Sequence, residues 1–575
     1  MRYLSFEIEN YRAIVEPLKI DLKNNSLIPL IGINECGKTT ILQAILCFDY
    51  AGDYINSKQD GQVGPHLQHT LNLYSTNDGI PTITATLEIS FSELESTYSS
   101  FSKENNIDPI QTPLPITKDN FSKDFNNIIT ISRNLKDLTY SIISPKILGD
   151  IDGFGKDLVS ASPYILYNDD FNDRPPTEVL IPSKKPATLS GWLDIYEQLF
   201  NDTDKTFSLF SLIQETDQRR RDTILSRVQK HLNEKLTKAW KTFHLDSKQG
   251  ALNLKLSLSD RPLGNGDYKL TINIIEDING TENTFHITDR SKGFLWFFNF
   301  IMKIEFNPKV TGEKKDTIYL LDEPGSYLHA SAQDKLCIKL KNISSKNGNI
   351  IFCTHSHHLL NPELIPLHKM YIIEKNAKKK ISAIPFTQYK VKGEKMTALQ
   401  PMYEALQMPM LNQISSMGTV LCVEGIYDYY ALKMLSTCHN KCNIIPSVSA
   451  DSMVKSIPFV IASGKKYILL WDNDKEGRNK RNEAIKTFGA ELEPHFLLLP
   501  DIADQHTRME NFIEKEDLSI MRKALGLDEG VSYEKTIGTL FFSSDKESIL
   551  KNITQKTKDN FTKINNLIEN TCKIP

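Results

Sequence analysis

The sequence predicts an α/β protein built from two successive strand-and-helix regions. A short apolar strand at 27–31 leads through a glycine-containing loop into an apolar helix. Two further compact apolar segments, 317–321 and 349–353, are typical of buried strands. A second alternation of strands and helices begins at Thr419. This order of elements is typical of sheets whose strands are joined by helices.

The overall composition is that of a soluble globular protein. With 575 residues, the chain is too long for one ordinary core, and we expect two to four domains. Its 68 basic and 71 acidic residues give a formal charge of -3, so any DNA-binding surface has to be local. No apolar run approaches the roughly 18 residues of a membrane span, and the N-terminus lacks a signal-peptide pattern, so we expect a cytoplasmic protein. The eight scattered cysteines fit reduced thiols, with half a zinc site at Cys438 and Cys442 as the alternative.

The first 190 residues give signals of uneven strength. Alternating apolar and polar residues predict strands at 4–8 and 82–92. Residues 51–75 are rich in glycine, glutamine and aspartate and indicate a loop. Residues 100–190 are polar, contain many Pro, Asn, Asp and Ser, and predict no definite element.

The middle of the chain has clearer patterns. From about 190 to 242, apolar residues recur at spacings of three and four, which predicts helices. Residues 251–287 alternate again and predict antiparallel strands. A lysine-rich stretch at 375–392 then becomes extended, and residues 393–418 are expected to form a connecting helical segment.

Residues 32–39 fit the phosphate-loop pattern G-x-x-x-x-G-K-[ST] in full. In this motif, backbone N–H groups at a helix N-terminus face the phosphates of a nucleotide. Lys38 would supply positive charge to the outer phosphates, and the Thr39 hydroxyl would bind Mg²⁺. The sequence therefore predicts an ATP site. The further nucleotide-binding residues expected in this loop are Asn34, Gly37 and Thr40.

Two later strands end in polar residues that suit the rest of an ATP site. One predicted strand is followed by Asp322 and Glu323, and the next leads to His355. Asp322 would support Mg²⁺, and Glu323 would polarise the attacking water. A histidine in the position of His355 can sense the γ-phosphate, although a lone histidine at a strand end is more often structural.

The C-terminal third carries a second set of acidic residues. One predicted strand ends in Glu424, and a later strand ends in Asp472-Asn473-Asp474. Because parallel strands present their carboxyl ends at one edge of a sheet, these three acids are expected to converge. The alternative is that they cap the helices that follow core strands.

Converging carboxylates repel one another unless a divalent cation neutralises them. Hard oxygen ligands suit Mg²⁺ or Mn²⁺, and such ions can activate water and stabilise the leaving oxygen of a phosphodiester. Asp428 follows Glu424 by four residues, about one helical turn on the same side, and joins the expected metal ligands.

The first set of motifs resembles the ABC-type ATPases of the SMC and RecF kind. The run 321–329 with Gln333 and Leu336 resembles the version in the OLD (overcoming lysogenisation defect) family of nucleases. The opening residues 8–12 are similar too. In ABC-type ATPases a signature loop reaches the ATP of a partner protomer, and the best match here is the segment 289–294.

The resemblance implies that Ser291 and Gly293 contact a γ-phosphate across a dimer. A plain loop between strand and helix is the alternative. ABC-type ATPases also use a Q-loop glutamine, which the sequence does not single out among three candidates: Gln59, Gln62 and Gln68.

The second set of motifs resembles the TOPRIM fold shared by topoisomerases, primases and OLD nucleases. The resemblance rests on Glu424-Gly425 followed by Asp428, and on the run 471–477 further along the chain. Together these two motifs are far more specific than either alone.

The resemblance to OLD nucleases implies two further residues near the C-terminus. Glu510 resembles a later acidic metal position, but Asn511 follows where a second acid is usual. A C-terminal lysine stabilises developing phosphate charge in these nucleases, and Lys546 is the candidate here, with Lys551 as the alternative.

The resemblance covers nearly the whole chain and implies its domain organisation. Residues 1–392 would form an ABC-type ATPase domain with a helical dimerisation insertion at about 190–245. Residues 393–418 would be a linker, and 419–575 a TOPRIM nuclease domain. The fold class is thus an α/β ATPase domain followed by a TOPRIM α/β domain.

The implied function is an ATP-regulated, Mg²⁺- or Mn²⁺-dependent DNA endonuclease. Many OLD-family nucleases, among them retron-associated nucleases and the nuclease subunit of the Gabija system, are anti-phage defence effectors. The implied partners are DNA, at least one further copy of the chain, and a defence protein such as a reverse transcriptase with its small DNA, or a helicase. ATP hydrolysis, as opposed to binding, stays open.

Two other functions compete with this interpretation. A non-nuclease SMC- or RecF-like ATPase, acting in DNA repair or as a DNA clamp, would use the C-terminal region as a binding module. A topoisomerase or primase would share the TOPRIM fold, but the sequence offers neither a zinc ribbon nor a strand-passage tyrosine in its own domain.

Overall fold

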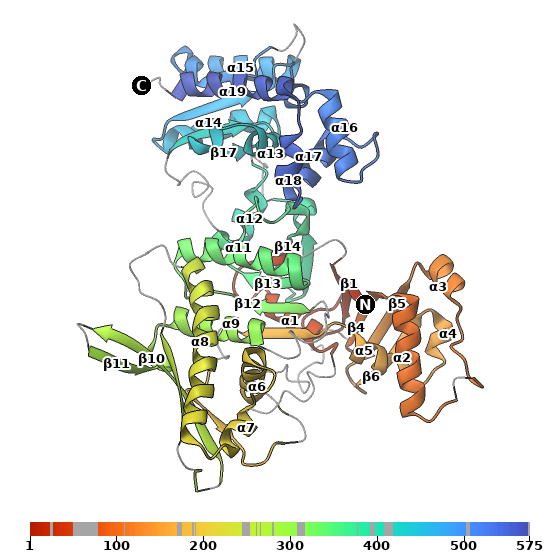
Figure 1. Ribbon diagram of the computed structural model, residues 1–575. Coiled ribbons are helices and arrows are strands. Elements are labelled where there is room, and N and C mark those ends of the chain that lie inside the picture. The colour runs from red at the N-terminus through yellow and green to blue at the C-terminus, as the bar shows by residue number, and fades with distance from the viewer. Residues whose placement is uncertain are drawn as a thin grey trace. The chain divides into compact units, whose positions relative to one another are not determined.

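The computed structural model describes residues 1–575 except 23–26, 50–78, 109, 170–174, 187–188, 190, 244–252, 260–261, 265, 279–280, 307–316, 377, 392–396, 408–417, 502–506 and 573–575. The chain divides into two compact units (Figure 1). The first comprises 1–361 and 369–385, and the second comprises 362–368 and 386–575. The sequence placed this division at 393–418, whereas the short segment 362–368 and the residues from 386 onward group with the second unit.

The first unit contains two sheets that frame the phosphate loop. The antiparallel sheet has the order β2-β1-β4-β5-β6, and its strands are β1 (Arg2–Glu9), β2 (Leu18–Asp21), β4 (Thr82–Glu88), β5 (Ile128–Asn134) and β6 (Thr139–Ser144). The mixed sheet has the order β15-β14-β3-β13-β12-β7, and its strands are β3 (Leu27–Ile31), β7 (Ile165–Asp169), β12 (Ile318–Asp322), β13 (Ile350–Thr354), β14 (Tyr371–Lys375) and β15 (Ile381–Pro385). Strands β7, β12, β13, β3 and β14 run parallel, and the apolar segments predicted β3, β12 and β13 among them.

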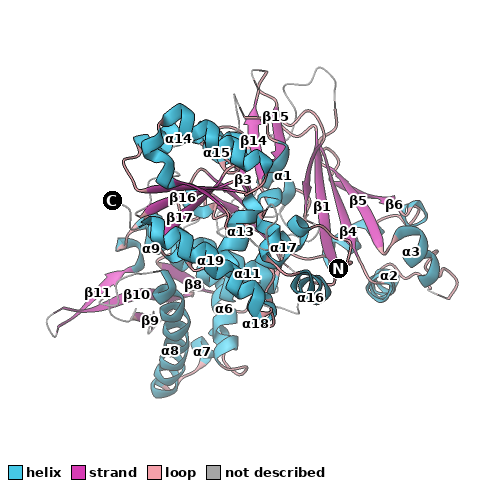
Figure 2. Cartoon of the chain, turned by 90° about the horizontal axis from the view of Figure 1, so that it is seen from above, coloured by secondary structure: helices cyan, strands magenta, loops and turns pink. Residues whose placement is uncertain are grey.

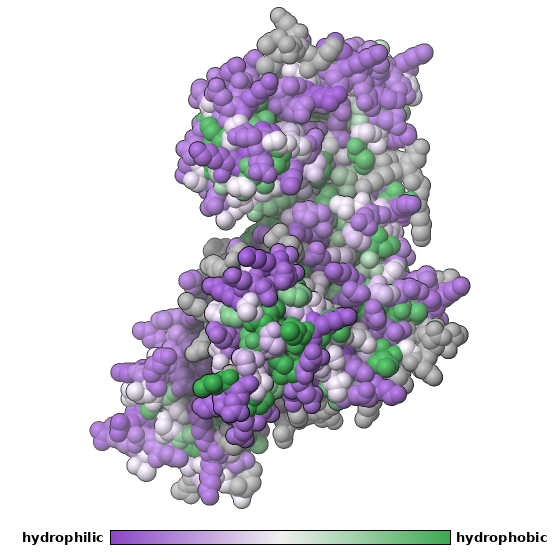
Figure 3. Space-filling view, turned by 90° about the vertical axis from the view of Figure 1, so that its right-hand side faces the viewer, coloured by the Kyte–Doolittle hydropathy of each residue, from purple (hydrophilic) through white to green (hydrophobic). Residues whose placement is uncertain are grey.

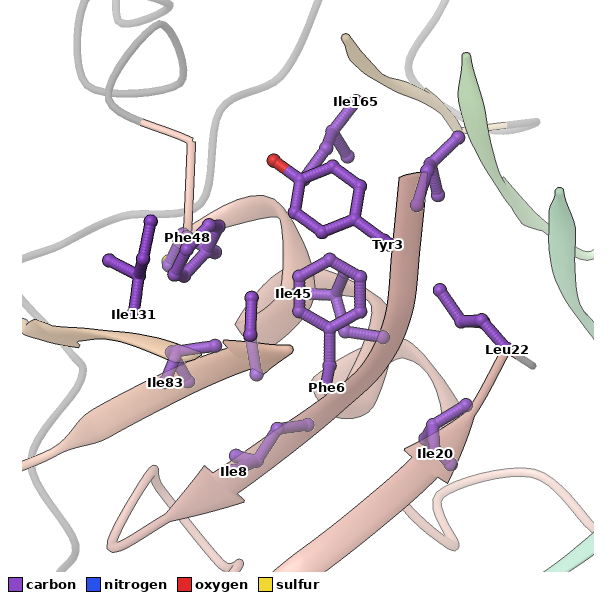
Figure 4. Close-up of a cluster of buried hydrophobic side chains, with 14 of the residues drawn as sticks. Tyr3, Phe6, Ile8, Ile20, Leu22, Ile45, Phe48, Ile83, Ile131 and Ile165 are labelled. Atoms are coloured by element: carbon purple, nitrogen blue, oxygen red, sulfur yellow. The ribbon is translucent and has the colours of Figure 1, made fainter. Parts of the chain in front are cut away.

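Helix α1 (Lys38–Leu46) packs its apolar side chains into the core shared by both sheets. Figure 4 shows Phe6 of β1 beside Ile45 of α1, with Tyr3 and Phe48 close by. The rings of Tyr3 and Phe48 meet edge to face with their centroids 6.0 Å apart. The phosphate loop is therefore fixed at both ends, by buried strand β3 and by buried helix α1.

Residues 82–190 differ most from the sequence-based prediction. The strand expected at 82–92 ends at Glu88, because Ser90 and Glu93 form a capping box that starts α2. Helices and strands also occur in residues 100–190, for which the sequence predicted no definite element. The helices between 82 and 190 are α2 (Phe91–Glu104), α3 (Lys118–Phe125), α4 (Lys146–Gly149) and α5 (Phe154–Ala161). The loop predicted at 51–75 lies outside the described residues.

Helices and a small antiparallel sheet occupy the middle of the first unit, as predicted for 190–242 and 251–287. The helices are α6 (Gly191–Thr203), α7 (Leu209–Gln214), α8 (Gln218–Phe243), α9 (Lys292–Phe306) and α11 (Ala330–Asn347). The strands are β8 (Glu178–Ile181), β9 (Leu254–Leu258), β10 (Tyr268–Ile278) and β11 (Thr281–His286). In Figure 1 the β10–β11 hairpin extends beyond α8.

The second unit is built on a parallel sheet with the order β17-β16-β18-β19. Its strands are β16 (Thr419–Val423), β17 (Cys442–Pro446), β18 (Tyr467–Trp471) and β19 (Phe496–Leu498). One apolar core joins the sheet to α13, α16, α17, α18 and α19, and another joins its opposite face to α14 and α15 (Figure 2). The helices are α12 (Gln400–Ala405), α13 (Ile426–Leu435), α14 (Ala450–Ala462), α15 (Lys475–Phe488), α16 (Lys515–Ala524), α17 (Tyr533–Phe542), α18 (Lys546–Lys551) and α19 (Gln555–Cys572).

Hydrophilic side chains predominate on the face shown in Figure 3. On this face, apolar side chains form small groups among hydrophilic ones. Among the described residues, no helix has both the length and the apolar composition that a membrane crossing requires.

Candidate functional site

The phosphate loop curls tightly around a buried lysine. The Lys38 ammonium group donates hydrogen bonds to the carbonyl oxygens of Gly32 at 2.9 Å and Ile33 at 3.0 Å. Gly37 precedes the helix with φ +108°, a conformation that L side chains rarely adopt, and a Cβ there would lie 2.3 Å from Ile381 Cδ1. The motif glycine is therefore required by both backbone conformation and space.

Asp322 stands at the end of β12, on the same sheet edge as the phosphate loop. The Thr39 hydroxyl donates to Asp322 Oδ1 at 3.1 Å, which joins the two motifs predicted to hold Mg²⁺. The Tyr167 hydroxyl of β7 donates to Asp322 Oδ2 at 3.2 Å. Both oxygens of this carboxylate are thereby oriented before any ligand arrives.

Glu323 is held between the Lys38 ammonium group and the His355 ring. Its Oε1 lies 3.3 Å from Lys38 Nζ, and its Oε2 lies 2.8 Å from His355 Nδ1. Burial raises the pKa of Glu323, but the hydrogen bond from His355 and the charge of Lys38 outweigh burial and lower it. The same hydrogen bond raises the pKa of His355. The Glu323 carboxylate is therefore paired with both Lys38 and His355.

A second set of contacts connects the loops that follow β12 and β13. Gln333 Nε2 donates to the carbonyl oxygen of Gly325 at 2.9 Å, and the Ser356 hydroxyl donates to Gln333 Oε1 at 2.6 Å. Glu323 itself has φ +48°, a strained conformation for a residue with a side chain. These bonds help to keep the strained turn in place.

The segment with the predicted signature residues begins α9. Ser291 Oγ accepts a hydrogen bond from Phe294 N at 3.3 Å, so the serine caps the helix. A Cβ on Gly293 would lie 3.2 Å from Leu328 Cδ2, so the segment packs against the loop after Glu323.

The remaining predicted nucleotide-binding residues lie along the phosphate loop and its helix. Asn34 is exposed on the loop, and Thr40 is half-buried in α1. The three Q-loop candidates, Gln59, Gln62 and Gln68, lie outside the described residues.

In the second unit, two acidic residues end neighbouring parallel strands. Glu424 follows β16 and Asp472 follows β18, which pair in parallel. Glu424 Oε1 accepts a hydrogen bond from the backbone N–H of Asp472 at 2.8 Å. A Cβ on Gly477 would lie 2.0 Å from the Asp472 carbonyl oxygen, so only glycine allows α15 to begin this close. The convergence expected for Glu424 and Asp472 is found.

Three further acids surround this pair. Asp428 Oδ2 accepts from Gly425 N at 3.0 Å, in the first turn of α13. Asp474 Oδ1 caps α15 by accepting from Gly477 N at 2.9 Å. Glu510, on the turn Met509–Phe512, contributes to raising the pKa of Asp428, although burial and the charges of Asp472 and Glu424 contribute more. We define the carboxylate cluster as Glu424, Asp428, Asp472, Asp474 and Glu510.

The carboxylate cluster carries unbalanced negative charge. Burial, followed by the charge of Asp472, raises the pKa of Glu424 to about 7. Burial, followed by the charge of Asp474, raises the pKa of Asp472 to about 6. Arg508 Nε lies 3.0 Å from Asp474 Oδ2, yet that exposed guanidinium does not restore an ordinary pKa to Glu424 or Asp472. Among the described residues, no three His, Cys, Asp or Glu side chains are placed to hold a metal ion as they stand.

The predicted phosphate-stabilising lysine makes different contacts. Lys546 Nζ lies 3.4 Å from the Phe541 carbonyl oxygen and 4.9 Å from the centre of the Phe541 ring. The structure therefore does not bring Lys546 together with the carboxylate cluster. The competing Lys551 is exposed at the end of α18.

Three residues at these sites were missed by the sequence analysis. They are Tyr167 beside Asp322, Arg508 beside Asp474, and Tyr533, a buried residue at the start of α17. Arg508 had a usable signal, because it lies two residues before the acid Glu510. Tyr167 and Tyr533 had none, since each reaches its site from a distant part of the chain.

The phosphate loop, the paired Asp322 and Glu323, and the parallel sheet between them define the chain's first unit as an α/β ATPase domain. Residues 28–361 match the protein family described as "AAA domain, putative AbiEii toxin, Type IV TA system". This match covers more than half of the chain, which therefore belongs to that family.

The chain is also similar to an uncharacterised protein, MJECL43 of Methanocaldococcus jannaschii, with 32% identity over 93 residues. That alignment spans 16% of this chain and 24% of the relative's length. Among solved structures, it is similar to an SMC head bound to the C-winged helix domain of ScpA, with 12% identity, TM-score 0.35, and coverage of 67% of this chain and 98% of that one. The SMC head domain from Thermotoga maritima matches with 14% identity, TM-score 0.30, and coverage of 68% and 100%.

Proposed function

We propose that the chain is an ATP-regulated, metal-dependent DNA endonuclease of the OLD family, with a TOPRIM nuclease domain in its second unit. The observation that carries the proposal is the approach of Glu424 and Asp472 from adjacent strand ends. Burial and the charge of Asp472 raise the pKa of Glu424, and burial and the charge of Asp474 raise that of Asp472. A divalent cation is the simplest partner for such a group, because it would neutralise the repulsion.

The residues of the carboxylate cluster fit Mg²⁺ or Mn²⁺ in their chemistry, since all are hard oxygen donors. Glu424, Asp428, Asp472, Asp474 and Glu510 are the proposed ligands. Because no three of them stand ready to hold an ion, side chains would have to turn towards it. A bound cation would supply activation of a water molecule and stabilisation of the leaving oxygen. Lys546 remains the proposed lysine for phosphate charge, and it would have to leave Phe541.

In the ATPase domain, Thr39 and Asp322 are the proposed residues for ATP-bound Mg²⁺, and Lys38 would contact the outer phosphates. Glu323 would orient the attacking water, since its lowered pKa keeps it ionised. His355, bonded to Glu323, would report the presence of the γ-phosphate. The proposed contribution of a second protomer is Ser291 and Gly293, which makes the active form at least a dimer.

The experiment is a nicking assay on supercoiled plasmid with Mg²⁺ or Mn²⁺. Replacing both Asp472 and Asp474 by Asn should lower cleavage at least about 100-fold while leaving ATP binding intact, because only the carboxylate cluster changes. The matched control is Asp559→Asn, an exposed acid on α19, which should cleave like the wild type. Unchanged cleavage by the double variant, in a pure preparation, would reject the site.

A non-nuclease SMC- or RecF-like ATPase is the second candidate. It is favoured by one observation: the family match ends at residue 361, before the carboxylate cluster begins. This candidate predicts ATP-dependent DNA binding by the wild-type chain without cleavage in either metal. That result would replace the nuclease proposal.

The proposed biological role is that of a bacterial anti-phage effector. The family description names a toxin of a toxin–antitoxin system, which fits a protein whose activity is harmful when released. The proposed partners are DNA and a defence protein, either a reverse transcriptase with its small DNA or a helicase. Cells expressing the wild-type chain with its neighbouring genes should resist phage, and cells expressing the Asp472/Asp474 double variant should not.

A further inference from the structure

Tyr533 carries a buried hydroxyl group with no hydrogen-bond partner among the described residues. It is the first residue of α17, its side chain is 9% exposed, and its ring belongs to the apolar core that joins α17 to α13. A buried phenol normally finds a hydrogen-bond partner, because leaving a polar group unsatisfied is unfavourable. The unpaired hydroxyl therefore suggests that a ligand completes its surroundings.

The apolar core around Tyr533 includes neighbours of the carboxylate cluster, since Tyr429 follows Asp428 and Met509 precedes Glu510. Burial raises the pKa of Tyr533 most, and the charges of Asp428, Asp472 and Glu510 raise it further. These acids come from the first turn of α13, the end of β18 and the turn Met509–Phe512. Tyr533 therefore shares its core with segments that carry these acids, yet none of them accepts a hydrogen bond from its hydroxyl.

The backbone already occupies part of this cluster. Asp428 Oδ2 accepts from Gly425 N, and Asp472 Oδ1 accepts from Met509 N at 3.3 Å. A phenol is protonated at neutral pH and can therefore donate. An oxygen atom of a hydrated cation or of a phosphodiester could accept a hydrogen bond from this phenol.

We infer that the Tyr533 hydroxyl donates a hydrogen bond to an oxygen ligand of the divalent cation held by the carboxylate cluster. The ligand oxygen belongs either to a water molecule on the cation or to a phosphate group of DNA. This inference rests on the proposed function, because it requires a divalent cation at the carboxylate cluster. It adds to that proposal a binding residue that comes from α17.

The test compares Tyr533→Phe with Tyr430→Phe. Both variants remove one phenol oxygen from the same apolar core, but the pKa of Tyr430 responds to burial and to Tyr427, and not to the carboxylates. Mn²⁺ binding without DNA is measured by calorimetry. Binding of uncleaved plasmid DNA is measured in Ca²⁺, and thermal unfolding is followed in metal-free buffer.

If water is the ligand, Tyr533→Phe should weaken Mn²⁺ binding about 3- to 10-fold, as expected for one lost hydrogen bond. If phosphate is the ligand, Mn²⁺ binding should stay constant and DNA binding should weaken by a similar factor. In both cases the metal-free variant should melt no lower than the wild type, since an unsatisfied buried hydroxyl has been removed. A purely structural tyrosine would instead lower the melting temperature.

The outcomes separate this inference from the proposed function. If the wild type binds Mn²⁺ and cleaves DNA, but Tyr533→Phe behaves like Tyr430→Phe in both binding assays, the role of Tyr533 is wrong and the nuclease stands. If the wild type neither binds Mn²⁺ nor cleaves, the proposed function fails, and this inference fails with it.

Discussion

The two acidic sites of this chain differ in how their charge is balanced. In the ATPase domain, Glu323 lies between Lys38 and His355, and these groups lower its pKa although it is buried. In the carboxylate cluster, burial and neighbouring acids raise the pKa of Glu424 to about 7 and that of Asp472 to about 6. In one site the acid is therefore paired with the chain's own residues, whereas in the other Glu424 and Asp472 hold their protons to higher pH.

This difference indicates what each site is prepared to receive. The ATPase site pairs its glutamate with cations of the chain, so ATP would compete with Glu323 for Lys38. A positively charged ligand would stabilise the carboxylate cluster most. The two sites should consequently respond in opposite ways to substitutions, metal ions and pH.

The largest effect is expected from Lys38→Ala. This change removes the ammonium group that pairs with Glu323 and would contact the phosphates of ATP. Loss of two charge-assisted hydrogen bonds should weaken ATP binding at least about 100-fold. Calorimetry with ATP and Mg²⁺ measures the change, and Mn²⁺ binding at the carboxylate cluster should stay as in the wild type.

Lys19→Ala is the control for that substitution, because Lys19 is exposed on β2. It should bind ATP like the wild type. Equal ATP affinities for Lys38→Ala and the wild type would mean that the phosphate loop does not hold the nucleotide.

A smaller effect with a defined pH dependence is expected from Glu424→Gln. Because the folded-state pKa of Glu424 is about 7, above the ordinary 4.5, the folded chain keeps a proton that the unfolded chain releases. The metal-free protein therefore loses stability as pH rises from about 4.5 to 7. Glutamine cannot ionise, so the variant should be more stable than the wild type at pH 8, on the order of 1–3 kcal/mol, and nearly equal to it below about pH 4.5.

Thermal unfolding without metal at the two pH values measures this difference, at about 2–4 °C per kcal/mol for a domain of this size. Glu516→Gln, at an exposed position of α16, should show no comparable pH dependence. Added Mn²⁺ should reverse the order at pH 8, because it stabilises only the wild type. A Glu424→Gln variant that is less stable than the wild type at pH 8 would contradict the charge imbalance.

Much of the framework of both sites could be predicted from the sequence, for one physical reason. Strands β3, β12 and β13 are buried along their whole length, and β16 and β18 along all but their first residue. Such strands appear as short apolar runs, and their ends carry the conspicuous polar residues. The positions of Asp322, Glu424 and Asp472 follow from that pattern, and that of Lys38 follows from the phosphate-loop motif after β3.

The strand predicted at 82–92 is found at Thr82–Glu88, but the region from 89 to 190 could not be predicted, because its pattern is broken by residues that pair after folding. In β5, Arg133 is 1% exposed and lies inside the core, where its guanidinium donates to the Cys47 carbonyl oxygen at 2.6 Å and covers the Tyr140 ring. A buried arginine in a strand resembles a surface residue when only the sequence is known. The Ser90–Glu93 capping box was a local signal that marked the start of α2.

The residues that contact or influence the site acids were also difficult to predict from the sequence. Tyr167 and Tyr533 come from segments far along the chain from the acids that they affect, and only the folded structure brings them together. Lys546 is the opposite case. Its position in the sequence suited a phosphate-stabilising lysine, but in the structure it contacts Phe541. Sequence thus indicates the ends of buried strands well, and the side chains that converge on them poorly.

The smallest effect is expected from Tyr167→Phe, which tests whether the ATPase site is oriented by its own residues. The change removes the hydroxyl that donates to Asp322 Oδ2 and keeps the buried ring, while Thr39 still holds Oδ1. Losing one of two orienting bonds should weaken binding of ATP with Mg²⁺ about 3- to 10-fold, with little change in unfolding temperature. Tyr98→Phe is the control, since its hydroxyl donates to the Thr112 carbonyl oxygen at 2.8 Å, away from Asp322. If both variants bind ATP and Mg²⁺ like the wild type, Asp322 is not positioned by Tyr167, and the contrast between a prearranged and an unbalanced site loses one of its supports.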